Sequence, residues 1–268
     1  MRWLICAMAL ACALPAHAEP RRIVSLDYCA DQFVLALADR DQIAALSRGA
    51  RRDDSYFRDR AAGIRQTRGT LEEVLALRPD LIVRNWGGPW DAEAVYGRFN
   101  IPVLQVGGAP DFIAAREDVR DAARTIGHVE RGEAIARDLD IRLARLAAGA
   151  PRQPSDVMYL SAGGAVAGSG TMIDAVIIAA GGRNLRTDAS WTVMPLERLV
   201  ETPPALIALG FFNSGREQVN AWSPSHHPAL RRALRDARTV QLPIAAISCE
   251  AWYAIDAADA IAAALRTP

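Results

Sequence analysis

The sequence predicts an α/β protein in which two lobes, each built on a parallel sheet, are joined by one long rigid α-helix and enclose a ligand cleft. Three observations support this fold class: an amphipathic segment near the middle of the chain, a group of residues that occurs on both sides of it, and strands that alternate with helices in both halves. The predicted boundaries are an N-terminal lobe over residues 19–127, an interlobe helix over 128–150 and a C-terminal lobe over 151–268.

The interlobe helix is predicted from the spacing of its apolar residues. Ile135, Leu139, Leu143 and Leu146 are four, four and three residues apart, and charged residues fill most of the other positions. This spacing places the apolar residues on one face of a helix. The segment ends with a glycine and then a proline, as helix C-termini commonly do. About twenty residues form a rod of roughly 30 Å.

Residues 71–83 and 196–208 contain the same residues in the same order, namely a Leu-Glu pair, a proline and a Leu-Ile pair. Each copy is predicted to form a short helix, a proline stop and a buried strand. Helix–proline–strand is a common arrangement in α/β proteins, so a chance match is one interpretation. The other interpretation, which we favour, is that the chain contains two similarly built lobes.

The remaining elements follow from short apolar runs and their flanking residues. Strands are expected at residues 22–26, 43–46, 81–83, 102–106, 157–160, 206–209, 240–242 and 244–247. Helices are expected at residues 30–38, 71–75, 91–99, 112–126, 172–180, 196–201, 228–236 and 255–265. Because strand and helix alternate, each lobe should be Rossmann-like, with helices covering a parallel sheet. Ligands bind outside the carboxyl ends of the strands in open sheets of this kind.

The first 18 residues are predicted to be a cleaved signal peptide. Arg2 supplies a positive charge, residues 3–14 form an apolar run too short to span a bilayer, and residues 16–18 form an Ala-His-Ala cleavage site. A lipoprotein leader ending before Cys12 is the alternative, although its apolar core would be very short. In the mature, exported chain Cys29 and Cys249 remain, and the sequence leaves open whether they form a disulfide or two separate thiols.

Several classes of function are disfavoured by the sequence. The formal net charge is zero, so no broad electrostatic field indicates a nucleic-acid partner. The glycine-rich run 161–171 lacks the spacing of nucleotide-binding motifs, and no G-x-S-x-G nucleophile elbow is present. His226 and His227 could ligate a metal, but we prefer a role at a helix entrance because no second cluster lies nearby. The sequence therefore predicts no enzyme activity, no cofactor and no metal site.

Aromatic residues make up only 6% of the chain, yet they gather at the loops that follow the expected strands. Large flat side chains around a crevice suit a large, partly apolar ligand. Plugging of the sheet ends is the structural alternative for any one of them. The predicted ligand-binding residues are Tyr28, Arg84, Trp86, Trp90, Trp191, Phe212, Trp252 and Tyr253.

Five phrases of this chain, taken in order, resemble one family. They are Arg-Ile-Val-Ser-Leu at 22–26, the run 70–83, Ala-Ala-Gly-Gly-x-Asn at 179–184, the second Leu-Glu run at 196–197, and His-Pro-Ala-Leu at 227–230. The chain resembles the periplasmic solute-binding proteins of ABC importers for ferric siderophores, haem and vitamin B12. The resemblance covers essentially all of the mature chain. It implies two α/β lobes joined by one long helix, a ligand between them and limited hinge motion.

The resemblance also implies partners. In this family a glutamate on the outer surface of each lobe docks onto arginines of the membrane permease, and these glutamates match Glu72 and Glu197. The expected partners are therefore an ABC permease with its ATPase and a metal-chelate small molecule, and the protein is expected to be a monomer in the periplasm. Cys29 after Tyr28 departs from the commonest family pattern. If Cys29 and Cys249 both face the crevice, a bridge between them would tie the lobes together.

The class of ligand stays open at this point. Anionic catecholate chelates usually require several basic residues, for which Arg84 and the loop residues Arg48, Arg51 and Arg52 are candidates. An aromatic, nearly neutral crevice suits a corrinoid or a hydroxamate chelate better. Haem would require an axial ligand such as Tyr28, Tyr253 or His226. Two other classes remain as alternatives: an exported hydrolase using Ser169 or Cys29, and a sensor with the same fold.

Overall fold

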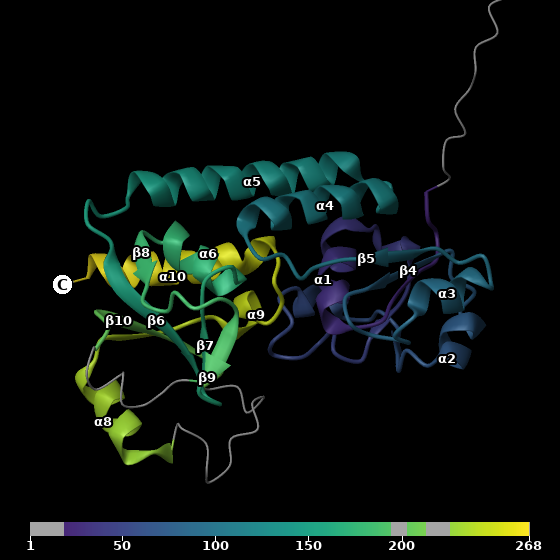
Figure 1. The fold of residues 1–268 in the computed structure, drawn as a ribbon. Coiled ribbons are helices and arrows are strands. Elements are labelled where there is room, and N and C mark those ends of the chain that lie inside the picture. The colour runs from purple at the N-terminus through teal and green to yellow at the C-terminus, as the bar shows by residue number, and fades with distance from the viewer. Residues whose placement is uncertain (1–18, 194–202, 213–225, 268) are drawn as a thin grey trace, which may run out of the picture.

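The computed structural model describes residues 19–193, 203–212 and 226–267, and this part of the chain contains the two predicted lobes and the joining helix (Figure 1). The predicted signal peptide and the predicted helix at 196–201, which carries Glu197, lie outside the described residues. None of the described helices is long and apolar enough to cross a membrane.

The N-terminal lobe is built on a parallel sheet with the strand order β3-β2-β1-β4-β5. Its strands are β1 (Ile23–Ser25), β2 (Ile43–Ser47), β3 (Gln66–Thr67), β4 (Leu81–Arg84) and β5 (Val103–Gln105). Its helices are α1 (Tyr28–Leu37), α2 (Leu71–Ala76), α3 (Ala92–Gly97) and α4 (Phe112–Ile126), with short 3-10 turns η1 (Arg40–Gln42) and η2 (Arg58–Ala61). The central strands are the most buried: every residue of β1 and the first three residues of β4 are covered, whereas β5 at the edge of the sheet is partly exposed.

The C-terminal lobe contains a second parallel sheet with the order β11-β10-β6-β8. Its strands are β6 (Ser155–Ser161), β8 (Gly182–Asn184), β10 (Leu206–Gly210) and β11 (Thr239–Gln241). Its helices are α6 (Met172–Ala179), α8 (Pro228–Asp236), α9 (Ile244–Ile247) and α10 (Ile255–Arg266), with the 3-10 turn η4 (Trp252–Ala254). The Thr171 side chain caps α6 by accepting a hydrogen bond from the amide of Asp174 at 3.2 Å.

Helix α5 (Val129–Ala148) is the predicted interlobe helix, and it spans both lobes along one side of the molecule (Figure 1). It packs on α4 of the first lobe and on α6 and α10 of the second. Gly132 allows the close approach of α4, because a Cβ at this position would lie 2.3 Å from the Cβ of Ala123. A charge-assisted pair between Arg120 and Glu133, at 3.0 Å, joins the two helices at their edge.

The local structure differs from the sequence expectations in one predicted strand and in several short strands that were not expected. The run 244–247, expected as a strand, is helix α9, because a short apolar run fits either element. Strand β9 (Trp191–Val193) and its antiparallel partner β7 (Ala165–Ala167), which lies in the glycine-rich run, were not expected. Gly168 permits this pairing, since a Cβ there would lie 1.8 Å from the carbonyl oxygen of Asp188. The glycines of this run thus serve strand pairing.

Residues 247–256, which we term the cross-lobe segment, belong to the C-terminal lobe in sequence but pack against the N-terminal lobe. The Trp252 ring contacts the edge of Phe33 at 4.9 Å between centroids, and Tyr253 stacks on Tyr56 at 4.5 Å. The Tyr56 hydroxyl donates to the carboxylate of Asp256 at 2.7 Å. One buried apolar cluster therefore runs continuously through both lobes.

A buried acid beneath the cleft makes the stability of the fold depend on pH. Burial raises the pKa of Asp31 to about 7, although hydrogen bonds from the amide and hydroxyl of Ser47 act to lower it. An unfolded Asp has a pKa of about 3.9, so between these values the folded state binds more protons than the unfolded state. The stabilisation is complete below about pH 4 and is lost as pH rises through about 7.

We therefore expect Asp31→Asn, which mimics the protonated acid, to raise the free energy of unfolding at pH 8 by roughly 1–3 kcal/mol. At about pH 4 the variant and the wild type should be equally stable. Urea unfolding at the two pH values measures this difference. An effect of Asp31→Asn that has the same size at both pH values would contradict the assignment.

Candidate ligand-binding cleft

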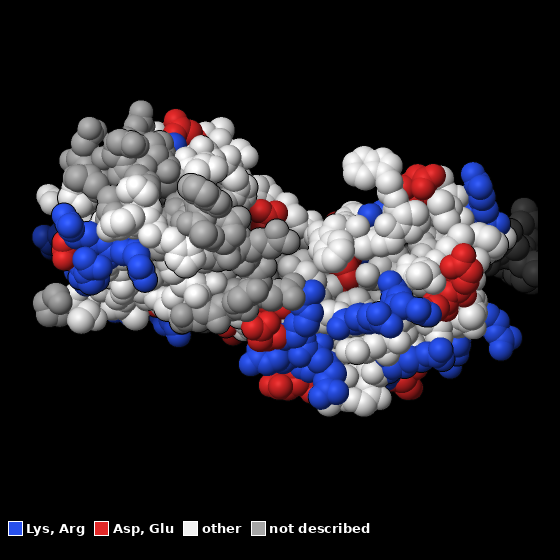
Figure 2. Space-filling model, turned by 90° about the horizontal axis from the view of Figure 1, so that it is seen from below, with Lys and Arg blue, Asp and Glu red and all other residues white. Residues whose placement is uncertain are grey.

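A cavity of about 300 Å³ lies between the lobes, at the carboxyl ends of the strands. Figure 2 shows the indentation between the lobes on the face seen from below. Loops and helix starts of both lobes contribute to it, together with the cross-lobe segment. Its lining residues are Tyr28, Cys29, Asn85, Trp86, Gly108, Met172, Ile173, Trp191, Phe211, Ile247, Ser248, Cys249, Glu250 and Ala254.

Two aromatic residues form the wall on the N-terminal lobe. Tyr28 is the first residue of α1, and Trp86 lies on the loop after β4. Their rings meet edge to face at 5.9 Å between centroids. The Trp86 side chain is 58% exposed, so most of its surface is available to a ligand.

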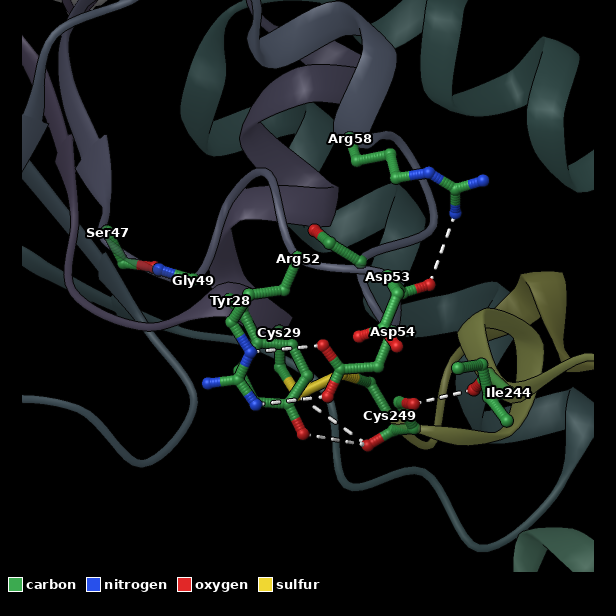
Figure 3. A network of polar contacts seen from close by, with 12 residues as sticks. Tyr28, Cys29, Ser47, Gly49, Arg52, Asp53, Asp54, Arg58, Ile244 and Cys249 are labelled. Carbon is green, nitrogen blue, oxygen red and sulfur yellow. Dashed lines mark hydrogen bonds and ion pairs between the residues drawn. A yellow bond between two sulfur atoms is a disulfide. The ribbon is translucent and has the colours of Figure 1, made fainter. Parts of the chain in front are cut away.

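Polar contacts fix the Tyr28 ring in place (Figure 3). The Arg52 guanidinium lies 4.9 Å from the ring centroid and also forms two hydrogen bonds, each of 3.1 Å, to the carboxylate of Asp54. The Tyr28 hydroxyl donates to the carbonyl of Ser248 at 3.4 Å. Burial, and then the nearby charge of Asp54, raises the pKa of Tyr28. The hydroxyl already has a backbone carbonyl as its partner and would have to leave it to coordinate iron.

The opposite wall comes from the C-terminal lobe. Trp191 in β9 is 45% exposed, and its ring meets the edge of the buried Tyr159 ring at 5.7 Å. Met172 and Ile173 are the first two residues of helix α6. Phe211 follows β10 with a φ of 63°, a left-handed conformation that is rare outside glycine. This turn of the backbone makes Phe211 a lining residue.

The floor of the cavity contains a disulfide between Cys29 and Cys249, 220 residues apart in the chain, with their Cα atoms 5.6 Å apart. Cys29 is the second residue of α1, and Cys249 belongs to the cross-lobe segment. The bond lies beside the hydrogen bond from Tyr28 to Ser248 (Figure 3). The two lobes are thus connected covalently directly beneath the site.

The charge of the described lining residues is unusual for a site that receives anions. None of them is an arginine or a lysine, and Glu250 supplies one carboxyl group. Burial raises the pKa of Glu250. Arg48 and Arg51 are exposed on the N-terminal lobe and do not line the cavity. The described cavity is therefore aromatic and neutral to acidic.

Of the eight predicted ligand-binding residues, the cavity brings together Tyr28, Trp86 and Trp191. Trp90 is 97% exposed and does not line the cavity. The Arg84 side chain is half-buried and reaches the carbonyl of Trp90 at 3.5 Å.

The other three predicted residues pack against apolar clusters. Phe212 packs against the cluster that contains Met158 and Ile207. Trp252 and Tyr253 are buried in the cross-lobe segment. The sequence predicts these two at a strand exit, but they follow helix α9, so the rule for strand exits does not apply to them.

Sequence reasoning missed several lining residues, among them Met172, Ile173, Phe211, Ile247 and Glu250. Phe211 was missed by one position, because the left-handed turn after β10 cannot be read from the sequence. Met172 and Ile173 belong to a helix that is apolar at almost every position, where apolar residues normally indicate core. Glu250 lies between Cys249 and Trp252, which the sequence analysis had already selected as candidate site residues. This position was the signal that could have identified Glu250 as a lining residue.

A larger cavity of about 680 Å³ lies under α5, behind Trp252 and Tyr253. Two of its lining arginines have carboxylate partners, Arg131 with Asp39 and Arg142 with Asp256. The other two, Arg40 and Arg60, donate to backbone carbonyls of the N-terminal lobe. We assign the ligand to the smaller cavity because that one lies at the carboxyl ends of the strands, where open α/β sheets bind ligands.

Of the two glutamates expected to meet a permease, Glu72 is exposed in the first turn of α2. The neighbouring Glu73 is engaged by Arg68, which holds the pKa of the Glu73 carboxyl at about 2. In the described part of the chain Glu72 makes no hydrogen bond or ion pair, so its carboxylate is available. Glu197 lies outside the described residues.

Comparison with known proteins places this geometry in context. A family model described as a periplasmic binding protein matches residues 23–212. A cobalamin-binding protein of Halobacterium salinarum is 28% identical over 211 residues, covering 74% of this chain and 56% of that protein. The chain thus spans little more than half the length of that relative.

Solved structures with similar folds include three periplasmic proteins. A haem-binding protein of Pseudomonas aeruginosa is 25% identical with a TM-score of 0.70, and the match covers 91% of this chain and 92% of that one. A vitamin B12 binding protein of Vibrio cholerae is 20% identical with a TM-score of 0.69, covering 92% and 97%. A binding protein of Veillonella parvula is 14% identical with a TM-score of 0.74, covering 94% and 93%.

Proposed function

Because the chain belongs to the periplasmic binding protein family, we propose that it is the solute-binding component of an ABC importer and that it captures a corrinoid such as cobalamin. The mature protein would act as a monomer in the periplasm after cleavage at Ala18. It would bind the ligand between its two lobes and deliver it to the permease through Glu72 and Glu197.

The observation that carries the choice of ligand is the aromatic cavity without described cationic lining residues. Haem carries two propionates, and ferric catecholates carry net negative charge, so among the described lining residues both would find no positive counter-charge. A corrinoid presents amide groups around its rim instead. The carboxyl group of Glu250 can accept hydrogen bonds from such amides, and Trp86 and Trp191 can cover the apolar parts of the ring.

Two further points support a corrinoid. The relatives include a cobalamin-binding protein from Halobacterium salinarum and a vitamin B12 binding protein from Vibrio cholerae. The Tyr28 hydroxyl donates to the carbonyl of Ser248, and its ring is held beside Arg52, so Tyr28 would have to leave these contacts to coordinate haem iron. Haem binding, which the Pseudomonas aeruginosa neighbour represents, is therefore the competing result in the test.

Isothermal titration of the mature protein with cyanocobalamin, haemin, a ferric hydroxamate and a ferric catecholate tests the proposal. We expect saturable binding of cyanocobalamin with a Kd below about 1 µM, roughly −8 kcal/mol or better. Trp86→Ala should weaken this binding about tenfold or more, because an aromatic wall that is largely exposed in the free protein becomes buried against the ligand.

Trp90→Ala is the matched control, since Trp90 lies on the same loop, is almost fully exposed and does not line the cavity. It should leave the Kd unchanged. Saturable binding of haemin without binding of cyanocobalamin would show that the ligand is haem and that the corrinoid proposal is wrong. Equal losses in the Trp86 and Trp90 variants would contradict the position of the site.

A further inference from the structure

One buried carboxylate connects the two segments that carry the N-terminal aromatic wall. Asp27 is 1% exposed and lies between β1 and α1. Its Oδ2 atom accepts hydrogen bonds from three consecutive amides, those of Asn85 at 2.7 Å, Trp86 at 3.1 Å and Gly87 at 2.8 Å. Its Oδ1 atom accepts from the amide of Ala30 at 2.9 Å and so caps α1.

We propose that Asp27 is the positioning residue of the cleft: its carboxylate holds the Trp86 loop against the start of α1, so that Trp86 and Tyr28 are fixed in their binding geometry before the ligand arrives. The inference rests on the proposed function, because it assigns Asp27 a role in that same site. Asp27 does not line the cavity, and it acts through the two residues that do.

The Trp86 loop is held at its ends by Asn85, which donates to the carbonyl of Val106 at 2.7 Å, and by Arg84, which donates to the carbonyl of Trp90 at 3.5 Å. Between these ends, in the described part of the chain, the side-chain hydrogen bonds come from Asp27. Residues 86–90 include two glycines and a proline, and the Trp86 side chain has the edge of Tyr28 as its ring neighbour. The loop also approaches β1 very closely: a Cβ on Gly87 would lie 2.5 Å from the carbonyl oxygen of Leu26. This approach brings the three amides within reach of one carboxylate oxygen, as in other backbone sites that bind anions.

Capping of α1 does not account for this arrangement. An N-cap needs one side-chain oxygen, and Oδ1 supplies it. The three loop amides use the other oxygen, which a serine or threonine cap would not have. Asp31, one turn further along α1, offers a contrast, because its carboxyl group bonds to the amide and hydroxyl of Ser47 and to no residue of the Trp86 loop.

Asp27→Ser separates the two roles. Serine is as good an N-cap as aspartate, but its single short hydroxyl cannot serve Ala30 and the three loop amides together. We expect hydrogen exchange of the amides of residues 85–87 in the ligand-free protein to accelerate about tenfold or more. The Kd for cyanocobalamin should rise about tenfold, because the loop must then be ordered on binding. Asp31→Asn is the matched control and should change neither quantity.

Unchanged exchange at residues 85–87 in Asp27→Ser would overturn the proposal, as would equal acceleration in Asp31→Asn. Faster exchange with an unchanged Kd would show that the contact holds the loop without serving binding, and would also overturn it. If Asp27→Ser does not fold, Asp27→Asn, which keeps the volume and one carbonyl oxygen, is tested for the same localised acceleration. If the wild type does not bind cyanocobalamin, the proposed function fails, whereas the exchange data still decide whether Asp27 fixes the loop.

Discussion

Trp252→Ala should reduce the free energy of unfolding by about 3–5 kcal/mol, the usual effect of removing a large buried aromatic side chain. Trp252 is 7% exposed and lies among Phe33, Phe57 and Tyr253. Phe33 and Phe57 belong to the N-terminal lobe and Tyr253 to the cross-lobe segment, so Trp252 packs where this segment meets the N-terminal lobe. Urea unfolding followed by far-ultraviolet circular dichroism measures the change.

The same variant distinguishes a core residue from a ligand contact. The sequence suggested that Trp252 contacts the ligand. In that case Trp252→Ala would weaken ligand binding and leave the free energy of unfolding nearly unchanged. Trp90→Ala serves as the control and should change the free energy of unfolding by less than about 0.5 kcal/mol, as exposed substitutions usually do. A stable Trp252→Ala protein that has lost its ligand would contradict the packing described above.

Removal of the disulfide by the double variant Cys29→Ser and Cys249→Ser should cost about 3–5 kcal/mol of stability. The bond joins residues 220 positions apart, so it restricts the unfolded chain over nearly its whole mature length. Long closed loops give the largest effect of this kind. The measurement is the urea midpoint of the unreduced wild type, the reduced wild type and the double variant.

The reduced wild type and the double variant should have the same midpoint, and reductant should not affect the double variant. These controls separate loss of the bond from effects of the serine side chains. Titration of the unreduced mature protein should find no free thiol. Two free thiols would show that the cysteines are not bonded.

Much of the architecture could be predicted because it depends on local patterns. The spacing of apolar residues predicted α5 to within about two residues at each end, and the same reasoning predicted α4 over its full length. Prolines and glycines marked the ends of these elements. Short elements were less predictable: α9 was expected as a strand, and the two-residue strand β3 carries no signal that distinguishes it from a loop.

The cleft could be predicted only in part, because its composition depends on contacts between distant segments. Tyr28 and Trp86 could be predicted as site residues because each follows a strand that the apolar runs of the sequence had predicted. Tyr253 was expected beside the ligand, yet it is buried against Tyr56, which lies between β2 and β3 of the N-terminal lobe. Asp27 gave no sequence signal, because its three amide partners lie about 60 residues further along the chain.

The path of the cross-lobe segment bears on how the exported chain acquires its structure. The core of the N-terminal lobe is completed by Trp252 and Tyr253, which lie within the last 17 residues of the sequence. A chain emerging N-terminus first cannot bury Phe33 and Tyr56 in their final environment until residues 252 and 253 have emerged. The N-terminal lobe therefore remains incompletely packed until Trp252 and Tyr253 are available. Secretion of a chain that stops at residue 246 should accordingly yield a product that is rapidly degraded by proteases.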